Sequence, residues 1–316
     1  MNKVIFLFIF CCFLFSCTKK EIKILVFTKT QTFRHQSIEA GVAAIFKLGR
    51  DNGITIDTTS DSEKFNEENL KQYSALLFMH STGELFDAGQ KNAFQRYIQA
   101  GGGWVGIHAA SDAEYHWPWY NKLAGAYFMS HPNQQKAKLI VMDQTHESTK
   151  HLNKEWNRYD EWYDFKSLNP DVKVLIQIDE TSYEGGKNGK IHPMAWYHEY
   201  DGGRAWYTGL GHTDESYQEE AFLQHVLGGI KWAIGKNKRN YKKVTTHLRP
   251  ENDRFTLERL IQGQLFEPTE MTILPNKDVL IVQRRGEMML YSESQKKITE
   301  VGKLDVYHQS KKKESM

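Results

Sequence analysis

The chain has 316 residues, of which 25% are charged and 40% hydrophobic, and its formal net charge is +2 at pH 7. These values are ordinary for globular proteins, and the length suits two domains better than one, at about 100–200 residues per domain. The near-neutral charge and the lack of a basic stripe argue against a nucleic-acid partner.

The first 17 residues, MNKVIFLFIFCCFLFSC, indicate a targeting signal rather than a part of the fold. One lysine precedes an apolar run that is shorter than the roughly 20 residues of a membrane span, as in a signal peptide. The stretch LFSC, from Leu14 to Cys17, resembles the lipobox of bacterial lipoproteins. The resemblance implies lipidation of Cys17 and a lipid-anchored protein of the cell envelope, facing the periplasm of a Gram-negative-type cell. An ordinary secretory signal or an N-terminal membrane anchor is the alternative.

All three cysteines, Cys11, Cys12 and Cys17, lie in this signal. If the signal is cleaved and Cys17 carries lipid, the mature domain has no free thiol and no disulfide. Catalysis by a cysteine nucleophile and zinc sites built from thiolates are therefore excluded.

Residues 22–110 predict strands that alternate with helices. The strands are short apolar runs, whereas the helices carry apolar residues at helical spacing and end at turn signals. Strands are expected at 22–28, 54–60, 75–80 and 104–110, with helices at 37–52, 65–73 and 86–103 between them. Asp87 is the expected N-cap of the last of these helices, and the glycines at 101–103 end it. This alternation indicates an α/β fold with a parallel sheet.

The pattern then changes to strands with few helices between them, at 137–143, 172–179, 194–200 and 204–210. These strands are expected to extend the sheet or to form an antiparallel edge. A closing helix at 219–235 carries Phe222, Val226 and Ile230 on one stripe. The first domain is therefore expected to span residues 22–235.

A polar, basic segment at 236–254 has no periodicity and indicates a linker, with a membrane-facing patch as the weaker alternative. Beyond it, short apolar runs joined by turns are expected to form strands at 255–263, 267–294 and 297–302. Residues 255–316 resemble the first blade of a β-propeller of the soluble quinoprotein glucose/sorbosone dehydrogenase type. A propeller needs about 4–8 blades to close, so this fragment is incomplete and indicates a truncated gene product. No propeller catalysis is assigned to it.

Histidines follow several of the predicted strands, at the edge where ligands collect in open α/β sheets. His80 and His108 end the third and fourth strands, and His212 follows the strand at 204–210. Such imidazoles act as general acids or bases, or bind a divalent metal together with a carboxylate. The candidate carboxylate partners are Asp112, Glu161 and Glu215. A hydrogen-bonded structural role is the alternative for any one histidine, but for His108 and His212 together we favour function. No ligand spacing singles out one metal.

Arg34 and His35 lie in the loop before the first predicted helix. A helix N-terminus attracts anions and polar oxygens, so these side chains suit an anionic or polyhydroxyl ligand. The alternative for Arg34 is an ion pair that fixes the loop.

Aromatic residues gather at 114–120, in an expected loop directly after His108, and at 156–165 among carboxylates. Flat rings such as those of Trp117 and Trp119 stack on the apolar faces of sugars, while carboxylates bind the hydroxyls. Core packing is the commoner role of tryptophan, but loop aromatics beside a strand-end histidine favour ligand binding.

Six short motifs occur in a fixed order along the chain: TFRH (32–35), GGGWVGIHAASD (101–112), MSHP (129–132), DEWYDF (160–165), HPMAWYHEY (192–200) and GRAWYTGLGH (203–212). Together they resemble the ThuA-like (trehalose-utilisation) family over residues 22–235. The resemblance implies a flavodoxin-like, doubly wound sheet similar to class I glutamine amidotransferases. It also implies a link to sugar or glycoside metabolism, with disaccharides such as trehalose as substrates and keto-sugars as proposed intermediates.

The amidotransferase comparison bears directly on His108. In that fold the turn after the corresponding strand holds the nucleophilic cysteine, and His108 occupies the matching place here. His212 matches the histidine of the amidotransferase triad, with Glu215 as its candidate partner. Glutaminase chemistry needs the thiol, so the resemblance implies that this chain is not a glutaminase.

These observations predict a carbohydrate-binding site that transforms a sugar or keto-glycoside by acid/base or metal-assisted chemistry. His108 and His212 are the expected acid/base groups, and Asp112 and Glu161 the supporting carboxylates. The residues expected to hold the ligand are Arg34, His35, His131, Trp117, Trp119 and Glu215. The cofactor is undetermined, with a divalent metal as the candidate. The alternative is a non-catalytic carbohydrate-binding module of a propeller dehydrogenase fusion.

Overall fold

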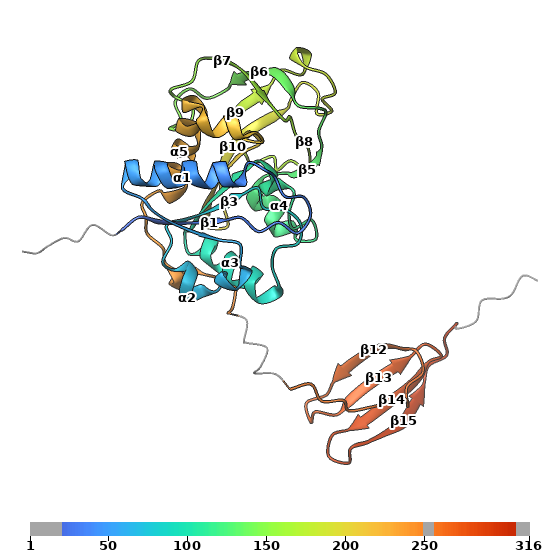
Figure 1. Ribbon diagram of the computed structural model, residues 1–316. Coiled ribbons are helices and arrows are strands. Elements are labelled where there is room, and N and C mark those ends of the chain that lie inside the picture. The colour runs from blue at the N-terminus through green and yellow to red at the C-terminus, as the bar shows by residue number, and fades with distance from the viewer. Residues whose placement is uncertain (1–20, 249–255, 308–316) are drawn as a thin grey trace, which may run out of the picture. The chain divides into compact units, whose positions relative to one another are not determined.

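The structure is a computed structural model that describes residues 21–248 and 256–307 (Figure 1). The expected signal at 1–17 and the lipidation of Cys17 lie outside the described residues. The chain divides into two compact units, Met1–Arg249 and Pro250–Met316, and each is described by itself. Within the described residues, no helix is long and apolar enough to cross a membrane.

The first unit is built on a nine-stranded sheet in the order β2-β1-β3-β4-β11-β10-β9-β6-β7. Five neighbouring strands run parallel: β1 (Lys23–Phe27), β2 (Thr55–Thr59), β3 (Ala75–Met79), β4 (Gly103–Ile107) and β11 (Gly203–Thr208). Their order, 2-1-3-4 followed by the last strand, is the flavodoxin-like order of doubly wound folds. The predicted fold class is therefore confirmed.

Four antiparallel strands extend the sheet beyond β11: β6 (Gln135–Val141), β7 (Glu155–Asp160), β9 (Lys173–Ile178) and β10 (Pro193–Tyr200). This confirms the expectation that the later strands extend the sheet or form an antiparallel edge. The sequence did not reveal β7, because its exposed positions are polar and its aromatic residues resemble a binding loop. A separate pair, β5 (Tyr127–Ser130) and β8 (Asp164–Lys166), was also missed.

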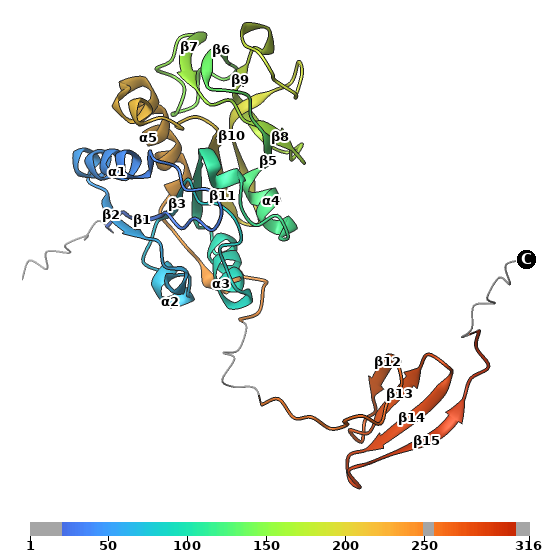
Figure 2. The same cartoon turned by 45° about the vertical axis from the view of Figure 1, so that its right-hand side comes forward.

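Helices cover both faces of the parallel half of the sheet, with α1 and α5 on one face and α2 and α3 on the other (Figures 1 and 2). The α-helices are α1 (Ile38–Asn52), α2 (Glu67–Leu70), α3 (Ala88–Gln99), α4 (Pro118–Ala124) and α5 (Glu220–Ile234). The short 3-10 helices are η1 (Ser62–Lys64), η2 (His108–Ser111), η3 (Glu180–Ser182), η4 (Asp214–Gln218) and η5 (Tyr241–Lys243).

Local sequence signals set the ends of the helices. Asp87 and Gln90 form a reciprocal capping box at the start of α3, as the sequence predicted for Asp87. Gly53 ends α1 in the left-handed conformation at φ 66°, which glycine adopts without steric cost. The predicted stripe of Phe222 and Ile230 on α5 is buried against the sheet.

Aromatic side chains fill much of the core. Phe27, Phe65 and Phe78 pack with ring centroids 4.6–5.8 Å apart beneath α2 and α3. Trp196 on β10 and Trp206 on β11 are fully buried, as expected for core tryptophans. Such a core holds the strand ends rigidly, because closely packed side chains leave little room for rearrangement.

The segment 236–248, expected to be a solvated tether, is instead bound to the first unit. The Asn240 amide donates to the Ala100 carbonyl at 2.7 Å, and the Thr246 amide donates to the side chain of Gln99 at 3.0 Å. The division between the units falls between Arg249 and Pro250. The backbone of this segment finds its hydrogen-bond partners on α3, which its polar sequence does not reveal.

The second unit contains a four-stranded antiparallel sheet in sequence order. Its strands are β12 (Pro268–Ile273), β13 (Val279–Gln283), β14 (Glu287–Ser292) and β15 (Lys297–Lys303). Val279, Ile281 and Tyr291 form its small core. The predicted all-β character is confirmed, but residues 256–263 form no strand, so that expectation was wrong. Only Ile261 of this stretch packs against the core, so its apolar spacing does not reflect a paired strand. The likeness to a propeller blade stays a prediction.

Candidate functional site

Two neighbouring parallel strands end in histidines with left-handed backbones. His80 follows β3 at φ 52°, and His108 follows β4 at φ 50°. A residue with a Cβ atom rarely adopts this conformation, and such strained residues cluster at functional sites. Both side chains are fully buried, at the carboxyl edge of the sheet. The strained turn therefore directs each imidazole across the strand ends rather than into a helix.

The surroundings of His108 fix its orientation. Its Nδ1 donates to the carbonyl of Gly209, just after β11, at 2.7 Å. The ring of Tyr163 covers one face, with the two centroids 4.0 Å apart. Because Nδ1 makes this bond, Nε2 is the ring nitrogen that faces the rest of the site.

That nitrogen meets two other side chains. Nε2 of His108 lies 3.3 Å from Oε2 of Glu161 and 3.1 Å from Nδ1 of His212, and these last two atoms are 3.1 Å apart. Burial alone would raise the pKa of Glu161, but its hydrogen bonds to the two histidines, and their charges, lower it below its usual value. Glu161 is therefore ionised at neutral pH, and its carboxylate faces one nitrogen of each histidine.

His35 adds a fourth group from the loop between β1 and α1. Burial, followed by the charges of His108 and His212, lowers its pKa to about 2, so the ring stays neutral. Its ring stacks on His80 with centroids 4.8 Å apart, and among the described residues its Nδ1 has no hydrogen-bond partner. One nitrogen or oxygen each of His35, His108, Glu161 and His212 lies within 4.8 Å of the others, close enough to hold a metal ion together.

Asp160 supports the loop that carries His212. Its buried carboxylate accepts the backbone amides of Gly211 at 2.9 Å and His212 at 3.0 Å. Arg158 lies 3.1 Å from the same carboxylate and balances its charge. The hydroxyl of Ser37 donates to the His212 carbonyl at 2.7 Å from the other side of the loop.

An open cleft of about 600 Å³ lies beside this cluster. It is lined by His131, Pro132, Asn133, Gln135, Glu184 and Gly185. His131 links the cleft to the cluster, because its Nδ1 lies 3.3 Å from the second carboxylate oxygen of Glu161. The side-chain amide nitrogen of Gln134 lies 2.8 Å from Nε2 of His212. The cleft and the cluster therefore meet at His131, whereas the four converging groups themselves do not line the cleft.

The chain is similar to known proteins in sequence and in fold. A model of the family described as "Trehalose utilisation" (ThuA) matches residues 23–233. The chain belongs to the ThuA family. Two solved structures are similar in fold, each with a TM-score of 0.58. A ThuA-like protein from Bacteroides uniformis is 24% identical over 70% of this chain and 95% of its own, and one from Parabacteroides merdae is 21% identical over 70% and 92%. No curated protein matches this chain.

The ThuA domain brings together five of the residues that the sequence singled out. They are His35, His108, His131, Glu161 and His212. Three others point elsewhere. Arg34 is exposed and pairs with Glu39, which is the alternative considered for it. Asp112 accepts a hydrogen bond from the Tyr115 hydroxyl at 2.6 Å, and Glu215 is exposed on η4, so Glu161 is the carboxylate that contacts His212.

The structure does not bring Trp117 and Trp119 to the cluster, and the loop expected for them is the start of α4. The two rings stack on each other at 4.8 Å, and Nε1 of Trp119 donates to Asp201 at 2.8 Å. Asp201 lies before β11, whereas the carbonyl that binds His108 lies after it. At about 3.3 Å per residue, the six residues of β11 put roughly 20 Å between these tryptophans and the cluster. They pack against α3 instead.

Sequence reasoning missed several parts of the ThuA site. His80 was placed at a strand end but given no part in the site, although it stacks on His35. Tyr163 lies inside the motif DEWYDF. Its ring contacts His108 because of the turn from β7 into β8, which the sequence did not predict. Gln134 carried no signal, and Asp160, although it begins the motif DEWYDF, was given no role because its bonds to the His212 loop depend on the fold.

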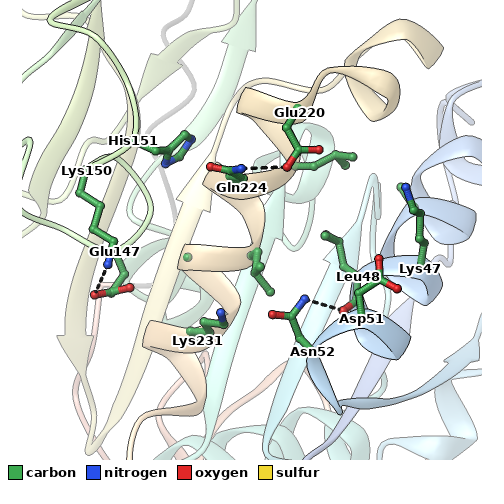
Figure 3. A pocket seen from close by; sticks show the side chains of 14 residues that line it. Lys47, Leu48, Asp51, Asn52, Glu147, Lys150, His151, Glu220, Gln224 and Lys231 are labelled. Carbon is green, nitrogen blue, oxygen red and sulfur yellow. Dashed lines mark hydrogen bonds and ion pairs between the residues drawn. The ribbon is translucent and has the colours of Figure 1, made fainter.

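Two further features of the ThuA domain lie outside this site. A hollow of about 410 Å³ between α1 and α5 is lined by a mixture of apolar and charged side chains, among them the ion pair of Lys150 with Glu147 (Figure 3). A cluster of Asp164, Glu180 and His192 also lies close together, but its polar atoms are largely used. The Glu180 carboxylate accepts two backbone amides and His192, and the other nitrogen of His192 lies 2.8 Å from a carbonyl. These residues therefore hold the backbone at Asn188 and Gly189 in place.

Proposed function

We propose that the ThuA domain binds a carbohydrate in the cleft and transforms it at the cluster of His108, His212 and Glu161. The observation that carries the proposal is the convergence of Nε2 of His108, Nδ1 of His212 and Oε2 of Glu161, 3.1–3.3 Å apart, beside an open cleft that His131 links to Glu161. The family description, trehalose utilisation, supports a sugar as the ligand. Polar side chains that line the cleft suit hydroxyl groups.

The chemistry proposed is proton movement beside a sugar carbonyl or hydroxyl, leading to isomerisation or cleavage of a sugar or keto-glycoside. Glu161 and His212, whose facing atoms are 3.1 Å apart, can take a proton from a substrate atom placed beside them and return it to a neighbouring substrate atom. His131 and Gln134, at the mouth of the cluster, are placed to hold the substrate. Because His108 replaces a nucleophilic cysteine, no covalent acyl intermediate forms, and glutaminase activity is not proposed.

A panel of disaccharides, including trehalose, and their keto-glycosides tests this function. With the substrate that reacts, His108→Ala is expected to lower turnover by at least about 100-fold, the usual scale of a lost acid/base group. His151→Ala is the matched control, since His151 is an exposed histidine that bonds the Ala221 carbonyl far along the chain. Equal turnover in His108→Ala and the wild type would overturn the proposal.

The second unit supports a different candidate, a non-catalytic carbohydrate-binding module. Its four-stranded sheet is the observation that favours it, because the resemblance to a propeller blade implies a fused dehydrogenase in longer relatives. In that case sugars bind, but no product forms over long incubation. His108→Ala then has no effect on turnover, because the wild type has no turnover either.

We also propose that the protein is located in the cell envelope, because the LFSC stretch that ends at Cys17 resembles a lipobox. The expected result is that the chain sediments with membranes and that Cys17→Ala releases it or leaves its signal uncut. Mass spectrometry of the N-terminal peptide gives the decisive measurement, because a diacylglyceryl cysteine has a distinct mass. An unmodified Cys17 in a membrane-bound chain would contradict this.

A further inference from the structure

We propose that His108, His212, Glu161 and His35 form a binding site for one divalent transition-metal ion. The proposal specifies the centre of the site described above, and its link to substrate rests on the proposed function. Metal binding itself does not depend on turnover and can be measured without any sugar.

The distances between the converging atoms fit an ion. Nε2 of His108, Nδ1 of His212 and Oε2 of Glu161 form a triangle with sides of 3.1–3.3 Å. Atoms of a tetrahedral site at about 2.0–2.1 Å from the metal are separated by about 3.3–3.4 Å. An ion about 0.9 Å above this triangle would lie about 2.05 Å from all three atoms. The site therefore needs only small adjustments to close on a metal.

The donor set also suits a cation. Nδ1 of His108 donates to the Gly209 carbonyl, which leaves Nε2 as the ring nitrogen that faces the other ligands. Glu161 adds a carboxylate oxygen that faces one nitrogen of each histidine. The side-chain amide of Gln134 places its nitrogen 2.8 Å from Nε2 of His212. Binding of the metal by Nδ1 of His212 requires this amide to turn, so that its oxygen accepts the Nε2 hydrogen.

Contacts behind the ligands hold them in place, as in known metal centres. The Gly209 carbonyl orients His108, and Gln134 orients His212. His131 lies 3.3 Å from the carboxylate oxygen of Glu161 that does not face the cluster. Each of the three ligands thus has an outer partner that fixes its direction.

His35 is the fourth protein group. It is 4% exposed, and its Nδ1 is buried without a partner among the described residues. A metal, or a water bound to it, would satisfy such an atom. At a coordination position that the protein leaves free, a sugar carbonyl or hydroxyl would replace a bound water and be polarised by the ion.

The ligand set selects the class of metal. Imidazoles with one carboxylate suit Zn²⁺, Mn²⁺, Fe²⁺, Co²⁺ and Ni²⁺, whereas Mg²⁺ and Ca²⁺ prefer sites built only from oxygen. The second cluster, at Asp164, Glu180 and His192, spends its atoms on internal hydrogen bonds. We therefore expect one ion per chain rather than two.

The test uses the full chain, stripped with a chelator and titrated with Zn²⁺ by calorimetry, followed by elemental analysis. One bound ion per chain is expected, and Co²⁺ in place of Zn²⁺ should give the intense visible absorption of a four-coordinate site. His108→Ala and the isosteric Glu161→Gln should each weaken binding by at least about 100-fold. His151→Ala should bind as the wild type does. Circular dichroism shows whether each variant folds.

Several results would overturn the metal site: no ion in the wild type, or full binding in both folded variants. Full turnover of a sugar by chelated, metal-free protein would overturn the link between the metal and the substrate while leaving the proposed function standing. Conversely, one ion that is lost in both variants, with no sugar turned over, supports the metal site and counts against the proposed function.

Discussion

Replacing Asp160 with asparagine tests how the His212 loop is held. The fully buried carboxylate accepts the amides of Gly211, His212 and Glu161 at 2.9–3.0 Å and pairs with Arg158 at 3.1 Å. An asparagine keeps one acceptor oxygen and places an amino group against an amide hydrogen. A buried donor left without a partner costs about 1–3 kcal/mol, and a broken buried ion pair about 3–5 kcal/mol.

Arg158 keeps part of its pairing, because Glu219 lies 3.3 Å away on the other side. We therefore expect Asp160→Asn to lower the free energy of unfolding by about 2–4 kcal/mol. The displaced His212 should also weaken Zn²⁺ binding by about 10–100-fold.

Urea unfolding followed by tryptophan fluorescence measures the stability of the first unit alone, because all eight tryptophans lie within it. The matched control is Asp61→Asn, at an exposed N-cap where asparagine caps equally well, with an expected change below about 0.5 kcal/mol. A loss below about 1 kcal/mol in Asp160→Asn would refute the reasoning, since the carboxylate would then not be what holds the loop.

Three further predictions follow from the contacts. Burial lowers the pKa of His225 from 6.5 to about 3, so its contribution to stability is full above pH 6.5 and is lost as the pH falls toward 3. Between pH 7 and pH 5, urea titrations should show a loss of stability that is about 2 kcal/mol larger in the wild type than in His225→Asn; an equal loss in both proteins would contradict this. Trp119→Phe should cost about 1 kcal/mol, the bond to Asp201, with no change in sugar turnover. Arg34→Ala removes an exposed ion pair with Glu39 and should change stability by less than about 0.5 kcal/mol, again with normal turnover. A tenfold loss of turnover in either variant would restore that residue to the ligand site.

The parallel half of the fold could be predicted because its sequence obeys local rules. Strands such as Ala75–Met79 are buried on both faces and appear as unbroken apolar runs. Asp87 and the glycines after α3 mark that helix at both ends. The edge strand β7 could not be found in this way, since only part of one face is buried and its alternation resembles a polar loop.

The site shows the same division. His108 and His212 could be predicted because a polar residue directly after an apolar strand stands at the ligand-binding edge. The tryptophans at 117 and 119 were misplaced, because an aromatic residue near a histidine in sequence need not lie near it in space. Proline at the first position of α4 starts a helix there, and the helix packs the rings on α3.

The antiparallel part of the sheet determines where Glu161 lies. In the parallel half, the strands β3 and β4 deliver His80 and His108 to the ligand-binding edge, and the loop after β11 delivers His212. Glu161 arrives instead at the end of β7, the outermost strand of the extension, and the turn into β8 brings it back over the strand ends. Its carboxylate then lies 3.1–3.3 Å from one nitrogen each of His108 and His212. The extension therefore supplies the carboxylate of the proposed metal site, and Glu161→Gln, which removes only its charge, should weaken metal binding without unfolding the domain.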